Sequence, residues 1–263
     1  MGILPNCKDP ALSALKSIGY NVVQLPRVDL HPTQLLVSSN KRLKRLGDLT
    51  SVFVPASDGP AIPAISADRP GPNIAITKTA SLDIGVGLNI LGGLISALGG
   101  STLGLSLFYA KAAKIEMEYG GTLENAAELA LIDQFLAGAK VSPYAKAAAQ
   151  MLDADQVYVV TSTLKATTLS AAATDEKKNA VGIDVPVLSN AVGGNLKVSS
   201  AGTGSTTVKF EGKIPLVFAF QAVRLIFDKG VYRLMKLVDG GGVIAEGMGE
   251  APLAADSDLL LSA

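Results

Sequence analysis

The sequence is poor in the side chains that most metal, redox and sugar sites use. Its 263 residues include one cysteine (Cys7), one histidine (His31) and no tryptophan. A single cysteine cannot form a disulfide within the chain, and this inventory cannot assemble a Cys-rich or multi-His zinc site in one subunit. Aromatic residues make up only 5% of the chain, which disfavours the carbohydrate cleft that paired catalytic carboxylates would need.

Net charge and nucleotide-binding motifs are also missing. The 23 basic and 23 acidic residues cancel, whereas a nucleic-acid-binding protein normally carries a basic excess. There is no Gly-Lys-Ser/Thr phosphate loop, and Gly85 and Gly87 lack the third glycine of a dinucleotide loop because Ile90 stands at that position. Cys7 and His31 have no local signature of a nucleophile and its base. We therefore expect a protein that is not an enzyme, binds no nucleic acid and holds no metal or cofactor.

Charge is distributed unevenly along the chain. No base follows Lys236, and the last 27 residues contain five acids, so the preceding residues hold 23 bases and 18 acids. The boundary is rich in glycine, which is typical of a flexible linker, and we expect a body over 1–238 and a linker with a tail over 239–263. The tail also carries apolar residues that would gain by docking on the body: Leu253, Leu259, Leu260 and Leu261. A solvated, frayed C-terminus is the alternative interpretation.

An uncharged run of 27 residues extends from Ile84 to Ala110. This length would suffice for a membrane-spanning helix, but its seven glycines each cost about 1 kcal/mol in a helix interior and argue against one. Before a break at Gly99–Ser101, a helical stripe is formed by Leu88, Leu91, Ile95 and Leu98.

After this break, alternating apolar residues predict a long strand that ends at Tyr119. Its apolar face begins with the candidate membrane-inserting residues Leu103, Leu105, Leu107 and Tyr109. The uncharged run could supply two membrane-crossing strands if neighbouring copies paired their edges. A buried helix followed by a long strand is equally compatible with the sequence and describes the resting state.

The remaining segments mix strands with helices. Alternation, β-branched residues and turn signals predict strands at 20–26, 30–37, 51–55, 157–169, 195–200, 206–210, 214–227 and 231–237. Capping and periodicity predict helices at 11–19, 122–137 and 142–152. We expect loops at 60–72 and at the basic cluster Lys41, Arg42, Lys44 and Arg45, which could contact anionic headgroups. This order favours an α+β fold with a twisted, largely antiparallel central sheet and surrounding helices.

Several runs of the sequence resemble bacterial gasdermins, the prokaryotic relatives of the animal pyroptotic pore-forming proteins. The sharpest similarity lies in the N-terminal runs Cys7-Lys8-Asp9-Pro10-Ala11-Leu12, Gly19-Tyr20-Asn21-Val22-Val23 and Leu25-Pro26-Arg27. It continues through Leu88-Asn89-Ile90-Leu91-Gly92 and Gly99-Gly100-Ser101-Thr102-Leu103-Gly104-Leu105. Chain length and the short tail also match, so that the resemblance spans essentially the whole chain.

The resemblance implies an α+β pore-forming domain that the C-terminal segment holds inactive. It implies that a protease, expected to be encoded nearby, cuts the linker and releases a body that assembles into a large ring in the inner membrane and kills the cell as antiphage defence. The uncut chain would be a cytoplasmic monomer, in keeping with an N-terminus that lacks a secretory signal. The candidate cleavage region comprises Asp239, Gly240, Gly241, Gly242, Gly247, Met248 and Gly249.

The resemblance also implies a palmitoyl chain on the N-terminal cysteine, and Cys7 is the one residue that can carry it. From the residues alone, an ordinary thiol is the alternative for Cys7. For the chain as a whole, the alternative function is a cytosolic lipid-binding or scaffold protein without lytic activity.

Overall fold

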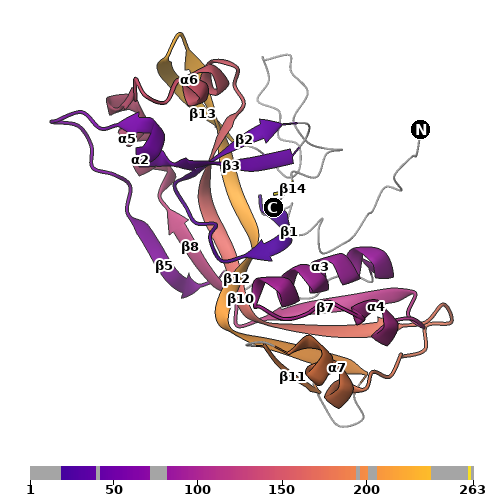
Figure 1. Ribbon diagram of the computed structural model, residues 1–263. Coiled ribbons are helices and arrows are strands. Elements are labelled where there is room, and N and C mark those ends of the chain that lie inside the picture. Colours follow the sequence, from indigo (N-terminus) through magenta and orange to yellow (C-terminus); the bar gives the residue numbers. More distant parts are fainter. Residues whose placement is uncertain are drawn as a thin grey trace, which may run out of the picture.

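Two long antiparallel strands, β10 (Val157–Thr174) and β12 (Thr207–Asp228), run through the molecule and join its upper and lower parts (Figure 1). The computed structural model describes residues 19–39, 42–71, 82–193, 196–200, 206–237 and 260–261. Within these ranges the two strands are central members of a 12-stranded sheet. All its pairs are antiparallel except the one between β3 (Arg42–Asp48) and β14 (Leu260–Leu261).

β10 changes its neighbour along its length. It pairs first with β2 (Gln34–Ser39), then with β8 (Leu123–Ala127), and finally with β7 (Lys114–Gly120). On its other side, its ladder with β12 contains register shifts between Val160 and Thr168. Because such irregularities bend and twist a strand, both long strands curve between the upper and the lower part.

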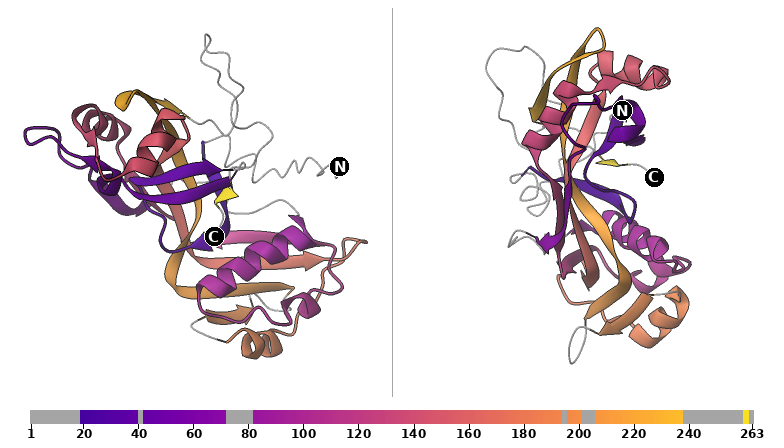
Figure 2. Two further views of the ribbon diagram at one scale, coloured as in Figure 1. Left: turned by 45° about the horizontal axis from the view of Figure 1, so that its top comes forward. Right: turned by 90° about the vertical axis from the view of Figure 1, so that its left-hand side faces the viewer.

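The lower part is a four-stranded sheet with helices on one face. Its strands lie in the order β7, β10, β12 and β11 (Leu196–Ser200), and β6 (Leu82–Asp83) adds a short edge beside β7. Figure 2 shows the helices on one side of these strands: α3 (Ile84–Ala97), α4 (Leu105–Phe108) and α7 (Val185–Val192).

The upper part surrounds the other ends of β10 and β12. Its further elements are β1 (Asn21–Arg27), α2 (Leu49–Val52), β4 (Phe53–Val54), β5 (Ile65–Pro70), α5 (Leu129–Gly138), β9 (Lys140–Val141), α6 (Lys146–Asp153) and β13 (Val231–Leu237). A separate apolar core forms here, in which the rings of Phe53 and Phe227 stack 5.8 Å apart. The lower part has its own core, so each end of the long strands is packed independently.

The fold class and the main strands agree with the sequence analysis. The α+β class with a largely antiparallel sheet is confirmed, as are the strand that begins at Val157 and the helix that carries Leu91 and Ile95. The expected strands at 206–210 and 214–227 form one continuous strand, β12. Within the described residues, no helix combines the length and the apolar character that a membrane crossing requires.

Several local predictions were wrong. The strand expected after the break at Gly99–Ser101 starts only at Lys114, because residues 105–108 form α4 after Gly104 adopts a φ of 76° that ends extended structure. Residues 123–127 are strand β8 and not the start of a helix, and α7 was not predicted.

Other corrections concern expected loops and boundaries. The basic cluster belongs largely to strand β3, and β5 lies within the expected loop at 60–72. Residues 49–52 form α2, β2 starts at Gln34, and the helix expected from residue 142 begins at Lys146. The helix expected at 11–19 lies almost entirely outside the described residues.

Candidate functional site

The four-stranded sheet of the lower part is amphipathic, and we call it the amphipathic sheet: β7, β11, residues 168–174 of β10 and residues 207–212 of β12. Buried and less buried residues alternate along β7, as period-2 geometry requires. One face carries buried apolar side chains: Ile115, Met117, Tyr119, Leu169, Ala171, Ala173, Leu196, Val208 and Phe210. The opposite face carries polar ones, including Glu118, Thr168, Ser170, Lys197, Lys209 and Glu211.

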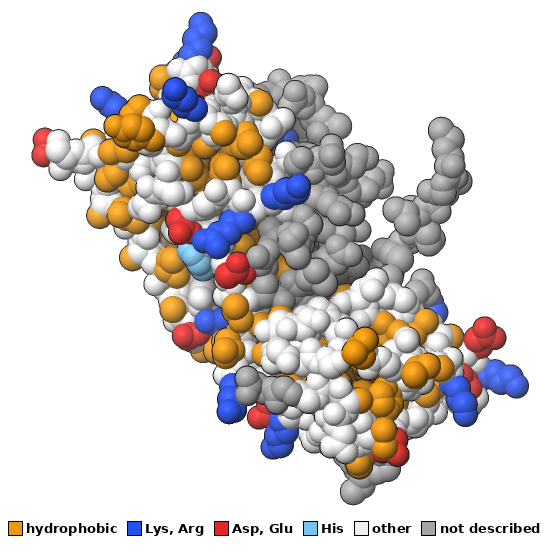
Figure 3. Space-filling view, in the orientation of Figure 1, with side chains coloured by type: hydrophobic (Ala, Val, Ile, Leu, Met, Phe, Trp, Pro, Cys, Tyr) orange, Lys and Arg blue, Asp and Glu red, His pale blue; other side chains and the backbone are white. Residues whose placement is uncertain are grey.

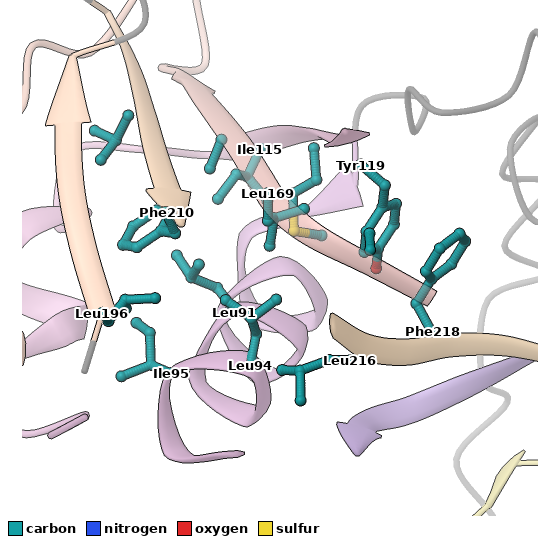
Figure 4. Packing of buried hydrophobic residues seen from close by; sticks show 14 of the residues in the cluster. Leu91, Leu94, Ile95, Ile115, Tyr119, Leu169, Leu196, Phe210, Leu216 and Phe218 are labelled. Atoms are coloured by element: carbon teal, nitrogen blue, oxygen red, sulfur yellow. The ribbon is translucent and has the colours of Figure 1, made fainter. Parts of the chain in front are cut away.

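The apolar face is buried by the helical cover, a name we use for α3, α4 and α7. Leu91 and Ile95 of α3 are fully buried in this core and point toward the strands in Figure 4, close to Ile115 and Phe210. At the bend, the rings of Tyr119 and Phe218 stack with their centroids 4.1 Å apart. The cover therefore shields the apolar face of the sheet from water.

The packing between α3 and β7 depends on a glycine. A Cβ on Gly87 would lie 1.8 Å from Cγ2 of Ile115, so any side chain at this position would force the helix and the strand apart. A similar close approach joins Gly212 of β12 to Leu98, whose Cδ atoms would be 2.7 Å from the added Cβ. Both glycines allow the helix to lie directly on the sheet.

The four residues predicted to insert into a membrane do not share one face in this structure. Leu105 is 6% and Tyr109 1% exposed, and both belong to the core, whereas Leu103 is 84% and Leu107 77% exposed. The expected common apolar face is thus absent here, because the chain turns through α4 in place of extending. Figure 3 shows hydrophobic side chains at the surface around α4 and α7, with charged ones toward the outer margin.

Burial of Tyr109 has an electrostatic consequence. Desolvation raises the pKa of its hydroxyl well above the ordinary value, and the buried oxygen has no hydrogen-bond partner among the described residues. The neutral phenol is therefore the form that the core accommodates.

A group of polar residues joins four segments of the chain at the bend. The hydroxyls of Tyr20 and Ser162 lie 2.7 Å apart, and they donate to Oε1 of Glu124 over 2.7 and 2.8 Å. Arg69 from β5 lies 3.3 Å from the other oxygen of the same carboxylate. We call these four residues the bend network; burial is the main cause that raises the pKa of Tyr20.

The sequence analysis did not find the bend network. Tyr20 and Ser162 are 142 positions apart, and Tyr20 and Glu124 are 104 apart. No local motif relates residues at such separations, and only the pairing of β8 with β10 brings Glu124 beside Ser162.

The C-terminal segment contacts the body through strand pairing. Leu260 and Leu261 form β14, which pairs in parallel with Arg42 and Leu43 of β3 and lies close to β1. Figure 1 shows this short strand at the edge of the upper part. The remaining tail and linker residues named above (Leu253, Leu259, Asp239, Gly240, Gly241, Gly242, Gly247, Met248 and Gly249) lie outside the described residues, as does Cys7.

The basic cluster is partly neutralised by acids on the same part of the molecule. The Arg45 guanidinium lies 3.7 Å from a carboxylate oxygen of Asp29 and 3.6 Å from one of Asp48. His31 Nε2 lies 3.4 Å from the same oxygen of Asp48. In the described part of the chain, no group of three or more His, Cys, Asp or Glu residues is arranged to hold a metal ion.

Comparisons with known proteins agree with this architecture. The model of the Bacterial Gasdermin Family matches residues 23–231. A gasdermin of Lysobacter enzymogenes is 58% identical over 99% of both chains, and one from a Desulfuromonadales bacterium is 38% identical over 94% of this chain and 92% of its own. The solved structure of a bacterial gasdermin from Bradyrhizobium tropiciagri has the same fold, with a TM-score of 0.60, 17% identity and coverage of 98% of each chain. The chain therefore belongs to the bacterial gasdermin family.

Proposed function

We propose that this chain forms membrane pores by exposing the apolar face of its amphipathic sheet to lipid. The observation that carries the proposal is the sheet itself, which has one continuous apolar face and one polar face. A strand of a pore needs this division, because one side contacts hydrocarbon and the other contacts water. In the resting fold the helical cover takes the place of lipid.

The strands must lengthen to cross a membrane. β7 contains 7 residues, whereas a tilted membrane strand needs about 9–11. Residues 103–113 precede β7 directly, and Leu105, Leu107 and Tyr109 have the same odd-numbered parity as Ile115 and Met117. If α4 unfolded and extended β7, these side chains would continue its apolar face. This route would give the predicted membrane-inserting residues a common face in the pore.

The C-terminal tail would act as the inhibitor. The pairing of β14 with β3 supports this role, since it places the tail on the body. While attached, the tail competes for this edge at an effective concentration on the order of millimolar, and a cut in the linker makes it a free peptide that leaves. A cut between Gly242 and Val243 would also remove four acids, and the released body would then carry 23 bases and 19 acids and be attracted to anionic lipids.

We further propose that the released body acts at the inner membrane, that its pores cause cell death in antiphage defence, and that palmitoylation of Cys7 anchors it. Each methylene of the palmitoyl group that enters the bilayer would contribute about 0.8 kcal/mol to the free energy of membrane binding. Intact mass of protein from a bacterial host should show an acyl adduct that Cys7→Ala lacks. A bare thiol in every preparation would remove the lipidation claim and leave the pore claim standing.

The central test uses the full chain with the site of a sequence-specific protease inserted between Gly242 and Val243. Vesicles of phosphatidylethanolamine and phosphatidylglycerol filled with a self-quenching dye should leak only after the cut. Equal leakage before and after would contradict inhibition by the tail. Binding of the cut protein to vesicles without leakage would favour the alternative, a lipid-binding or scaffold protein.

The membrane-inserting residues need a matched pair of variants. Leu107→Glu changes an exposed side chain, so the resting protein should stay folded while leakage after the cut is lost. Leu105→Glu would place a carboxylate in the core and should destabilise the resting fold as well. Retained leakage by Leu107→Glu would refute its place on the lipid side.

A further inference from the structure

Strand β5 is attached to the bend by polar contacts and not by apolar burial. All six of its residues are exposed. It pairs with β8, and this ladder is irregular between Ser66 and Arg69, where Asp68 adopts a φ of 56°. The backbone N–H of Asp68 donates to Oδ1 of Asn125 over 2.9 Å. The side chains of Asp68 and Arg69 reach two charged residues of the neighbouring strands.

Each of these charged contacts joins an exposed side chain of β5 to a mostly buried one. Nζ of Lys165 in β10, whose side chain is 12% exposed, lies 2.5 Å from Oδ1 of Asp68. The guanidinium of Arg69 lies 3.3 Å from Oε2 of Glu124 in β8, whose side chain is 18% exposed. β5 thus supplies counter-charges to two mostly buried charges, which would be costly to leave unpaired. We call Asp68, Arg69, Glu124 and Lys165 the polar strap.

The two contacts of the strap lie on opposite faces of the sheet. β8 and β10 pair Glu124 with Leu164 and Leu123 with Lys165. Residues directly opposite in a ladder point to the same side, and neighbours along a strand point to opposite sides. Glu124 and Lys165 therefore project to different faces, and β5 holds β8 and β10 from both faces at once.

The strap lies beside the point at which the sheet bends. β7 and β8 keep one register against β10, because Gly120 lies opposite Thr168 and Leu123, three residues on, lies opposite Lys165. The interruption between β7 and β8 falls at Gly121, which has a φ of 63°. The ladder between β10 and β12 is also irregular on both sides of this lysine. The bend is therefore a local interruption of strands that are otherwise in register.

Straightening at this point would join β7 and β8 into one strand. They contain 7 and 5 residues, so the joined strand would exceed the about 9–11 residues that a membrane crossing needs. Their common register means that neither would change its pairing partners on β10. The polar strap opposes this change, because its contacts fix β5, β8 and β10 in the relative positions of the bent sheet.

We propose that the polar strap is a latch: it keeps the sheet bent in the resting protein, and its opening sets the rate at which the released body converts into a pore. The inference rests on the proposed pore function and adds a second control to it. The tail would decide whether conversion starts, and the strap how fast it proceeds. Charged contacts suit a latch, because water that enters at the bend can solvate the freed groups and little apolar surface is exposed.

The test follows leakage of the same dye-filled vesicles by the full chain after the cut at the inserted site. Asp68→Asn and Arg69→Gln each remove one charge with little change in shape. Each should speed leakage about tenfold, because a hydrogen bond to a charged group no longer stabilises the bent state. Both positions are exposed, so the uncut variants should fold and should not leak. Asp58→Asn and Lys140→Gln make the same charge changes at exposed sites of the upper part and should leak like the parent.

Two further variants separate a latch from a general loss of stability. Ile132→Val removes a methylene from the fully buried side chain of α5, so it lowers the free energy of unfolding without touching the strap and should leave the leakage rate unchanged. Asp68→Lys combined with Lys165→Asp exchanges the charges of one pair and should return the rate toward that of the parent, whereas each alone should speed leakage. Circular dichroism of the uncut variants checks that each is folded.

The outcomes separate the latch from the function on which it rests. Parental or slower leakage by both Asp68→Asn and Arg69→Gln would refute the latch and leave pore formation intact, as would equal acceleration by Ile132→Val. Leakage by the uncut strap variants would overturn the assignment of the strap to a step after the cut. Absence of leakage by the cut parent would refute pore formation itself, and the latch with it.

Discussion

Replacing Gly87 by alanine tests whether α3 lies on β7 as closely as the structure places it. The added Cβ would be 1.8 Å from Cγ2 of Ile115, about half of a normal carbon–carbon contact. Ile115 is fully buried and β-branched, so its χ1 angle cannot easily move the methyl away. The helix must therefore shift away from the sheet.

The expected magnitude follows from two opposing effects. Alanine in place of glycine favours a helix interior by about 1 kcal/mol, and overpacking a well-filled core costs about 1–3 kcal/mol or more. We expect a net loss of about 1–2 kcal/mol and a fall in Tm of roughly 2–8 °C. Gly92→Ala in the same helix is the matched control, since its Cβ would be 3.7 Å from Thr102 Cγ2 and 4.0 Å from Leu105 Cδ2.

Thermal and urea unfolding of the full-length variants, followed by circular dichroism, compares the two substitutions directly. Gly92→Ala should raise the free energy of unfolding by about 0.5–1 kcal/mol, because it gains helix propensity without a clash. The variants should therefore change stability in opposite directions. If Gly87→Ala were as stable as Gly92→Ala, α3 would not be seated on β7 at this distance, and the helical cover would need another description.

The remaining predictions concern single interactions. Asp184→Ala should lower the free energy of unfolding by about 1 kcal/mol in urea titrations, because the Asp184 carboxylate accepts a hydrogen bond from the backbone N–H of Val187 at the start of α7. Asp184→Asn, whose side-chain oxygen can accept the same hydrogen bond, should retain most of this stability. Tyr20→Phe should lower the free energy of unfolding by about 1–2 kcal/mol in the same titrations, because the Glu124 carboxylate of the bend network then loses one hydrogen-bond donor. An unchanged urea midpoint would contradict this prediction. Burial raises the pKa values of Tyr109 and Tyr119 above the ordinary 10.0, so the folded chain keeps protons that the unfolded chain loses. The tyrosine contribution to the free energy of unfolding should therefore stay constant below about pH 10 and fall at higher pH. Urea midpoints that do not change from about pH 9 to 11 would refute this prediction.

The long strands were predictable because their signal is local. β10 and β12 are rich in β-branched and alternating residues over many positions, and no glycine cluster interrupts the stretch from Val157 to Thr174. The helical stripe of α3 was predictable for the same reason, since its buried residues recur at helical spacing. Alternation along β7 likewise identified its apolar face, with Ile115, Met117 and Tyr119 buried together.

Turns and tertiary contacts were not predictable in this way. Gly99 and Gly104 both adopt φ angles of 76° and redirect the chain around α4, but the sequence there alternates as a strand does. The bend network depends on residues that only the complete sheet brings together. The pairing of β14 with β3 involves two residues of a tail whose apolar groups suggested docking without indicating the edge.

The wrong strand prediction for residues 103–113 bears on the proposed function. Of the residues in this period-2 apolar pattern, Leu105 and Tyr109 pack in the core, but Leu103 and Leu107 remain at the surface and do not stabilise the resting fold by burial. Exposed leucines cost solubility, so a second state in which they are buried would account for their presence. Places where local sequence preference and the observed structure disagree are expected at functional sites. The same stretch would meet its pattern only as an extension of β7, which is the change that pore formation requires of it.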